Sequence, residues 1–235
     1  MTKHLIYFSI IFFSLLFLDI YTKINLEVIP YRYITKILAV GSLVSFTIFY
    51  FYKKKALKNN LLIYGLFVFF IGDIIIIDHL NMVKFYVSLL LFVAGKICYT
   101  LKFMHKEDFS INRLIPFFIV CFLYVAIVYN FIFPNLKLYF IPITLYFFIT
   151  LLMTLFAYIR KGVANRKSYY LVLCGVGFFI VSETIMVIKM FYGDVLFQDF
   201  MVMFCYGAAQ YLIVLGLIFE DKSLTVKINS ILQAP

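Results

Sequence analysis

Long, uninterrupted apolar stretches dominate the chain. A helix that crosses a bilayer needs about 20 mostly apolar residues, and eight stretches approach or reach that length. Turn residues such as Pro134-Asn135 and Lys/Arg clusters separate them. The stretches are Leu5–Tyr21, Tyr33–Tyr52, Leu61–Ile77, Phe85–Phe103, Leu114–Phe133, Leu138–Tyr158, Tyr169–Phe191 and Phe200–Phe219. They are continuously apolar rather than alternating, which disfavours a strand barrel. We predict an all-α polytopic membrane protein with eight transmembrane helices in one transmembrane domain, residues 1–235.

Composition excludes a soluble fold. Apolar residues make up 65% and charged residues 14% of the 235 residues, against roughly 45–50% and about 25% in soluble domains. A globule of this size cannot bury so much apolar surface. The first stretch starts with a basic residue but lacks a small-residue cleavage site, so we interpret it as an uncleaved span.

Basic residues fall unevenly between the predicted loops. Fourteen lie on the side that holds the N-terminus, and four lie on the opposite side, namely Lys23, Arg32, Lys84 and Lys137. The positive-inside rule then predicts that both termini are cytoplasmic, with a short tail from Glu220 onward. The net charge of +10 suits anionic membrane lipids as partners and needs no nucleic acid. A bacterial inner membrane is the expected location.

Ionisable side chains within spans are the first candidates for function, because a charge in the bilayer needs a partner or water. Lys36, Asp73, Lys96 and Glu183 are such residues. Asp73 and Glu183 fit one cavity in the outer half of the membrane, or they are two separate acids. Lys96 is expected to join an ion pair, to bind substrate, or to extend its ammonium group toward the membrane surface.

Other polar residues support or surround these candidates. Tyr99 shares a helical face with Lys96, and Tyr206 shares one with Gln210. We expect Tyr206 and Gln210 to point inward, where they bind substrate or hold helices together. Charges near span ends are interpreted as solvated; these are Asp19, Asp78, Lys189, Asp194 and Asp199.

Neither a metal site nor a disulfide is indicated. The four cysteines all lie within spans without paired spacing, and the three histidines do not cluster. Structural zinc sites need closely spaced Cys and His ligands. We therefore expect no metal and no other cofactor.

A faint internal repeat relates the two halves of the chain, although chance is an alternative in so biased a sequence. At a shift of 110 residues the matched pairs include Gly65 with Gly175, Gly72 with Ser182, and Asp73 with Glu183. Two repeats of four helices would have the same orientation, related by an axis along the membrane normal.

These motifs, in this order, resemble the YhhN/TMEM86 family of integral membrane lysoplasmalogenases, which have eight spans. The resemblance rests on Thr35-Lys36, Gly72-Asp73, Gly95-Lys96-x-x-Tyr99, Ser182-Glu183 and Tyr206-x-x-Ala209-Gln210. Three positions depart from the family pattern. Ile37 stands where the family usually has Pro, Lys96 where it usually has His, and Glu183 where it usually has Asp.

The resemblance implies hydrolysis of the vinyl ether bond of a lysoplasmalogen, giving a fatty aldehyde and a glycerophospho-headgroup. One carboxyl would protonate carbon and the other would stabilise the resulting cation, as two carboxyls do in glycosidases. Asp73 and Glu183 are the catalytic candidates, with their roles open. Lys36 or Lys96 would hold the phosphate of the lysophospholipid or lower the pKa of one of the two acids. The full substrate-binding set is Lys36, Lys96, Tyr99, Ser182, Tyr206 and Gln210.

Two other classes of function are alternatives. A proton- or ion-coupled transporter would use Asp73, Glu183 and Lys96 as a relay. A non-catalytic membrane sensor would use the same polar residues to lock helices together.

Overall fold

The computed structural model describes residues 2–53, 60–105 and 111–232, with side chains at 4–53, 60–105 and 112–220. Within these residues the chain is helical and contains no strand, which confirms the all-α prediction. The helices are α1 (Thr2–Asn25), α2 (Tyr31–Lys53), α3 (Leu61–Ile75), η1 (Ile76–Asp78), α4 (Met82–Phe103), α5 (Ile111–Leu136), η2 (Lys137–Tyr139), α6 (Phe140–Ile159), α7 (Arg166–Phe191) and α8 (Gln198–Leu232).

Seven helical segments of the described chain are long and apolar enough to cross a membrane. One of them, Asn112–Ile159, is 48 residues long and contains α5, η2 and α6. Large apolar side chains such as Ile119 and Phe122 are exposed on the helices, as contact with lipid requires. The architecture is that of a multi-pass membrane protein, while eight crossings and cytoplasmic termini stay predictions. Part of the topology argument rests on Lys54, Lys55, Lys58 and Lys106, which lie outside the described residues.

The chain divides into two compact units. The first unit comprises Met1–Lys102 and Val195–Gly207, and the second comprises Phe103–Asp194 and Ala208–Pro235. The first unit therefore holds α1 to α4 and the start of α8, and the second holds α5 to α7 and the rest of α8. The single transmembrane domain stays a prediction.

Glycines let α3 and α4 approach closely in the first unit. A Cβ atom at Gly95 would lie 2.7 Å from the Phe69 ring, and one at Gly65 would lie 2.9 Å from the Tyr99 ring. Both aromatic side chains are fully buried, with ring centroids 5.1 Å apart. Small residues at a helix seam permit such contacts between membrane helices. The seam thereby fixes α3, the helix that carries Asp73.

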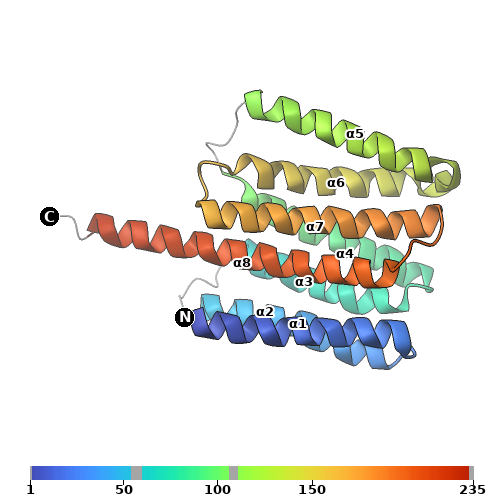
Figure 1. Ribbon diagram of the computed structural model, residues 1–235, viewed down its shortest axis with the longest axis horizontal. Helices are drawn as coiled ribbons and strands as arrows, with labels where there is room; N and C mark the ends of the chain where they lie inside the picture. Colours follow the sequence, from blue (N-terminus) through green and yellow to red (C-terminus); the bar gives the residue numbers. More distant parts are fainter. Residues whose placement is uncertain (1, 54–59, 106–110, 233–235) are drawn as a thin grey trace. The chain divides into compact units, whose positions relative to one another are not determined.

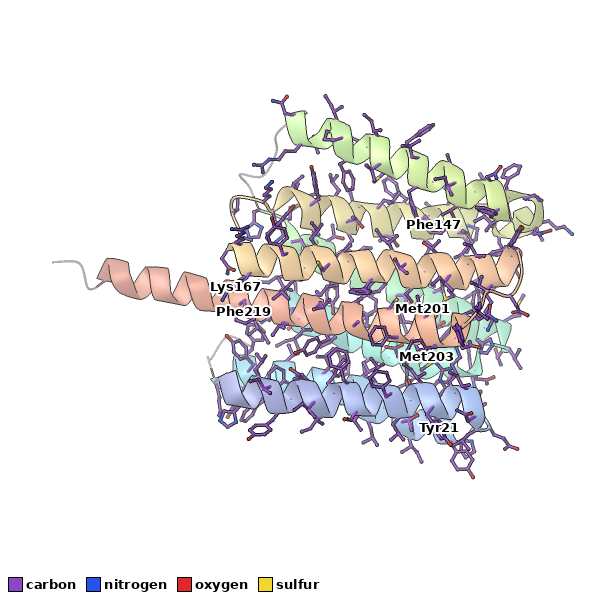
Figure 2. All side chains as sticks on the ribbon, in the orientation of Figure 1. Tyr21, Phe147, Lys167, Met201, Met203 and Phe219 are labelled. Carbon is purple, nitrogen blue, oxygen red and sulfur yellow. The ribbon has the colours of Figure 1, made fainter. Side chains whose placement is uncertain are left out.

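The second unit has an apolar core between α5, α6 and α7, which lie side by side (Figure 1). Its buried residues recur every four positions along each helix and so form one stripe per helix. They are Val128, Ile132, Leu136, Ile143, Phe147, Val187 and Phe191. Figure 2 labels Phe147 on α6. This core holds α7, the helix that carries Glu183.

The turn between α5 and α6 was expected at Pro134-Asn135, but it lies further along the chain. Helix α5 continues through Pro134 to Leu136, and the chain turns at Lys137, where φ is 40°. Pro134 removes only one backbone hydrogen bond from the helix. Asn135 donates its side-chain amide to the carbonyl oxygen of Phe191 at 2.6 Å. Because Phe191 ends α7, Asn135 serves to cap a neighbouring helix rather than to turn its own chain.

Glu220 is not the exposed first residue of a tail, while a cytoplasmic tail after it stays a prediction. Helix α8 continues to Leu232, and the Glu220 side chain is buried. Its carboxylate lies 2.8 Å from Arg160 Nη2 and 3.2 Å from His105 Nε2. The carbonyl of the preceding residue, Phe219, accepts a hydrogen bond of 3.0 Å from the Asn165 amide. Glu220 is therefore held by ion pairs inside the second unit.

Candidate functional site

Asp73 lies at the centre of a three-helix cluster in the first unit. Its side chain is 2% exposed. Lys36 Nζ on α2 lies 3.2 Å from Asp73 Oδ1, and the Tyr206 hydroxyl on α8 donates a 2.8 Å hydrogen bond to Oδ2. The Lys36 ammonium also lies 5.2 Å from the centroid of the Tyr206 ring, within the range of a cation–π contact. The structure thus brings together three residues that were singled out from separate spans.

Aromatic packing positions this cluster. A Cβ atom at Gly72, next to Asp73, would lie 2.9 Å from the Phe92 ring. Phe92 is on α4, and its ring meets the Tyr206 ring edge-on with centroids 6.3 Å apart. Gly72 therefore makes room for Phe92, and Phe92 supports the ring whose hydroxyl binds Asp73. An apolar wall beside a carboxylate strengthens its electrostatic interactions.

Asp19 was expected to be a solvated charge near the end of a span, and this expectation is wrong. The side chain is fully buried on α1. The Thr35 hydroxyl on α2 donates a 2.8 Å hydrogen bond to Asp19 Oδ1, whereas Asp19 Oδ2 has no hydrogen-bond partner. Thr35 directly precedes Lys36, so one short segment of α2 contacts both Asp19 and Asp73.

Arg32 was predicted to lie in a loop, but it is a buried residue of α2 beside the candidate site. Helix α2 begins at Tyr31, two residues earlier than predicted, so Arg32 lies one turn before Lys36 on the same face. Its side chain is 6% exposed. Arg32 Nη2 lies 3.7 Å from the Sδ atom of Met203, labelled in Figure 2, and Arg32 Nε has no hydrogen-bond partner. Arg32 precedes Lys36 by four residues, and this helical spacing was the sequence feature that could have identified it.

Glu183 lies in a hydroxyl-lined position in the second unit. The Tyr146 hydroxyl donates a 2.6 Å hydrogen bond to Glu183 Oε1, and Thr150 Oγ1 lies 2.8 Å from Oε2. Both partners are on α6, and Glu183 is buried beside the equally buried Ser182. Neither Tyr146 nor Thr150 was among the residues predicted from the sequence. Glu183 and Asp73 belong to different compact units, so their shared cavity stays a prediction.

The remaining predicted residues are buried. Lys96 and Tyr99 are fully buried on α4 of the first unit, and Gln210 is 2% exposed in the second unit. The Thr100 hydroxyl donates to the Lys96 carbonyl oxygen at 2.8 Å. Their roles in binding substrate stay predictions. In the part of the chain that the structure describes, no three His, Cys, Asp or Glu side chains form a group able to hold a metal ion.

Arg160 forms a second buried polar cluster in the second unit. Besides Glu220, Arg160 Nη2 contacts Ser168 Oγ at 3.3 Å, and the guanidinium lies 5.3 Å from the Phe103 ring centroid. His105 shares Glu220 with Arg160. The hydrogen bond to Glu220 raises the pKa of His105 above its ordinary value of 6.5, against an opposing effect of partial burial. The cluster joins the end of α4, the connection between α6 and α7 with the start of α7, and α8.

Comparisons with known proteins agree with the resemblance seen in the sequence. Searches among characterised proteins and among solved structures found no match. A family model, described as the YhhN family, matches residues 31–217. This range includes all the predicted site residues, from Lys36 to Gln210, and also Arg32, Tyr146 and Thr150. Because the match covers most of the sequence, the chain belongs to the YhhN family.

Proposed function

We propose that this protein is a membrane hydrolase that cleaves the vinyl ether bond of a lysoplasmalogen, releasing a fatty aldehyde and a glycerophospho-headgroup. The observation that carries the proposal is the buried Lys36–Asp73–Tyr206 cluster. These are residues through which the chain resembles the lysoplasmalogenases. Membership of the YhhN family and the helical, membrane-like fold support the same reaction class.

Hydrolysis of a vinyl ether needs a proton donor and a group that stabilises a cation. The donor transfers a proton to the carbon one bond removed from the ether carbon, leaving an oxocarbenium ion. Water adds to the ether carbon and loses a proton, and the hemiacetal breaks down to an aldehyde and the glycerol hydroxyl. A carboxylate near the cation stabilises it and accepts the proton of water, as in glycosidases.

Asp73 suits the role of the carboxylate. Each of its oxygens faces a donor, the Lys36 ammonium or the Tyr206 hydroxyl. A carboxylate has about four lone-pair positions, so two remain for water or for the developing cation. Lys36 and Tyr206 hold the carboxylate in one orientation, and such positioning of charge is a large part of catalysis.

Glu183 suits the role of the proton donor, which the sequence left open between Asp73 and Glu183. Thr150 Oγ1 lies 2.8 Å from Glu183 Oε2 and 3.0 Å from the Tyr146 carbonyl oxygen. A hydroxyl has one proton, and a helical Thr commonly donates it to the carbonyl four residues earlier. The lone pairs of the Thr150 oxygen can then accept a hydrogen bond from Glu183 when Glu183 acts as the acid.

The test follows aldehyde release from a lysoplasmalogen by protein purified in detergent, with a coupled dehydrogenase. We expect activity from the wild type, and a loss of about 100-fold or more in kcat for Asp73→Asn and for Glu183→Gln. Asp78→Asn is the matched control, because Asp78 is partly exposed and pairs with the exposed Lys84. It should leave kcat unchanged. A folded wild type that releases no aldehyde would overturn the proposal, and gradient-dependent uptake would then favour the transporter.

A further inference from the structure

Two oppositely charged side chains in the first unit each keep a buried polar atom without a partner. These atoms are Asp19 Oδ2 and Arg32 Nε. Asp19 is fully buried and Arg32 is 6% exposed, so bulk water does not satisfy either group. Buried polar atoms in proteins are hydrogen-bonded in the large majority of cases. The two exceptions therefore point to a ligand that this corner of the unit is built to hold.

Asp19 and Arg32 belong to one site. Thr35 connects them, because its hydroxyl donates to Asp19 Oδ1 at 2.8 Å and lies 3.4 Å from the Arg32 carbonyl oxygen. Arg32 lies within electrostatic reach of the Asp19 and Asp73 carboxylates. Arg32 also reaches α8 through Met203. The end of α1 and the first turns of α2 and α8 thus surround the site.

The chemistry of the two unpartnered atoms specifies the ligand. A guanidinium has five N–H donors in a planar fork that matches the oxygens of a phosphate. The acceptor that Arg32 contacts, a thioether sulfur at 3.7 Å, is weak by comparison. Asp19 Oδ2 is an acceptor and requires a donor or a cation. A phosphate beside Arg32 and an ammonium group beside Asp19 would satisfy both.

Charge balance favours a ligand that carries both groups. Asp19 and Asp73 offset Arg32 and Lys36, so these four buried charges sum to zero. At the more exposed rim, Lys23 pairs with Asp199 at 2.9 Å. A ligand with a net charge would leave a buried charge uncompensated, which is costly. A zwitterion preserves the balance.

The depth of the site suits a lipid headgroup. Arg32 is the second residue of α2 and Asp19 is in the last two turns of α1, near the level at which headgroups meet the hydrocarbon. Lys36 lies one turn, about 5.4 Å, further along α2. A headgroup held by Arg32 would therefore direct the glycerol and its ether oxygen toward Lys36 and Asp73.

We propose that Asp19 and Arg32 form a headgroup subsite for a zwitterionic lysophospholipid, in which Arg32 binds the phosphate and Asp19 binds the ammonium group. The orientation of the lipid, with its ether toward Lys36 and Asp73, rests on the proposed function. Binding of the headgroup does not depend on any reaction. Lys36 and Asp73, one turn deeper, are left to act on the ether.

The first test compares ligands on the wild-type protein. Calorimetric titration in detergent would use a saturated 1-O-alkyl lysophosphocholine, the 1-O-alkyl glycerol 3-phosphate, the 1-O-alkyl glycerol, and free phosphocholine. None contains a vinyl ether, so none is cleaved. We expect the zwitterionic lipid to bind at least about tenfold more tightly than each of the other three. Equal affinities of the three lipids would overturn the subsite. If free phosphocholine binds as tightly as the zwitterionic lipid, the assignment of the subsite to a lipid is overturned.

The second test assigns the residues. Arg32→Gln should lower the affinity for both phosphate-bearing lipids about tenfold and leave that for the alkyl glycerol unchanged. Asp19→Asn should remove the preference for the zwitterion over the glycerol phosphate. Lys84→Gln, at an exposed pair, is the control. If folded Arg32→Gln and Asp19→Asn variants keep the ligand preferences of the wild type, the assignment of these two residues to the headgroup is overturned. If the protein releases aldehyde but shows no headgroup preference, only the subsite proposal is overturned. If it shows the headgroup preference but releases no aldehyde, only the proposed hydrolase activity is overturned.

Discussion

Tyr146 occupies in the second unit the sequence position that Lys36 occupies in the first, because each lies 37 residues before the acid whose carboxylate it contacts. Tyr146 follows Lys36 by 110 residues, the same shift that aligns Glu183 with Asp73. The contacts of the second and third helices therefore recur in both halves. Equivalent contacts of this kind support an internal repeat. The partners differ, a cation in one half and a hydroxyl in the other, so the two acids have different surroundings.

Tyr146→Phe should lower kcat for aldehyde release roughly tenfold with little change in KM, because the 2.6 Å hydrogen bond to Glu183 is lost. The coupled dehydrogenase assay measures both constants. Tyr129→Phe is the matched control, since the Tyr129 hydroxyl contacts Thr144 at an exposed position of the same unit. If the two variants have equal activity, Tyr146 has no part in positioning Glu183.

Gly175→Ala should destabilise the protein by about 1–3 kcal/mol through overpacking. A Cβ atom at Gly175 would lie 2.9 Å from Ile213 Cγ1 and 3.0 Å from the Ala209 carbonyl oxygen on α8. Gly177→Ala, two residues further along α7, meets no atom within 4 Å and should be neutral or slightly stabilising. Thermal unfolding in detergent compares them. A Gly175→Ala variant as stable as Gly177→Ala would contradict close packing of α7 on α8.

Glu220→Gln should destabilise the second unit by about 3 kcal/mol, because it leaves the fully buried Arg160 without its carboxylate. Lys84→Gln breaks an ion pair of 2.7 Å between exposed groups and should have no measurable effect. The same unfolding assay serves both variants. Similar midpoints for Glu220→Gln and the wild type would show that Arg160 does not depend on this pair.

The midpoint of unfolding should fall as pH rises above about 6.5, through the folded-state pKa of His105. Glu220 raises that pKa in the folded state. The stabilisation from protonated His105 is therefore complete below the unfolded pKa and is lost as the folded form releases its proton. His105→Gln should flatten this part of the pH profile, whereas His79→Gln, at an exposed position, should retain it. An unchanged slope in His105→Gln would exclude His105 as its source.

Continuous apolar stretches were sufficient to predict the helices, and the cost of intramembrane charge was sufficient to single out Lys36, Asp73 and Glu183. Tyr206 was expected to point inward, and its hydroxyl does bind Asp73. The grouping of Lys36, Asp73 and Tyr206 could not be predicted from the sequence, because it depends on which faces of α2, α3 and α8 meet. Tyr146 could have been found by extending the repeat to the helix before each acid.

Asp19, Arg32 and Glu220 were misjudged for a shared reason. Each lies close to the end of an apolar stretch, where a charge normally reaches water. In the structure the helices continue past these ends, so Arg32 starts α2 and Glu220 is within α8. Partners from other helices then allow the charges to be buried, as Thr35 does for Asp19 and Arg160 for Glu220. Hydropathy along one segment contains no information on such partners.

The contact between Asp73 and Tyr206 spans 133 residues of sequence, and this has a consequence for biogenesis. Ribosomes add about 5–20 residues per second, so Lys36 and Asp73 enter the membrane on the order of ten seconds before Tyr206 is synthesised. During that interval the carboxylate has its cation but lacks its hydroxyl donor. The nascent chain therefore carries an incomplete cluster, and the contacts of Asp73 are completed only when α8 is inserted.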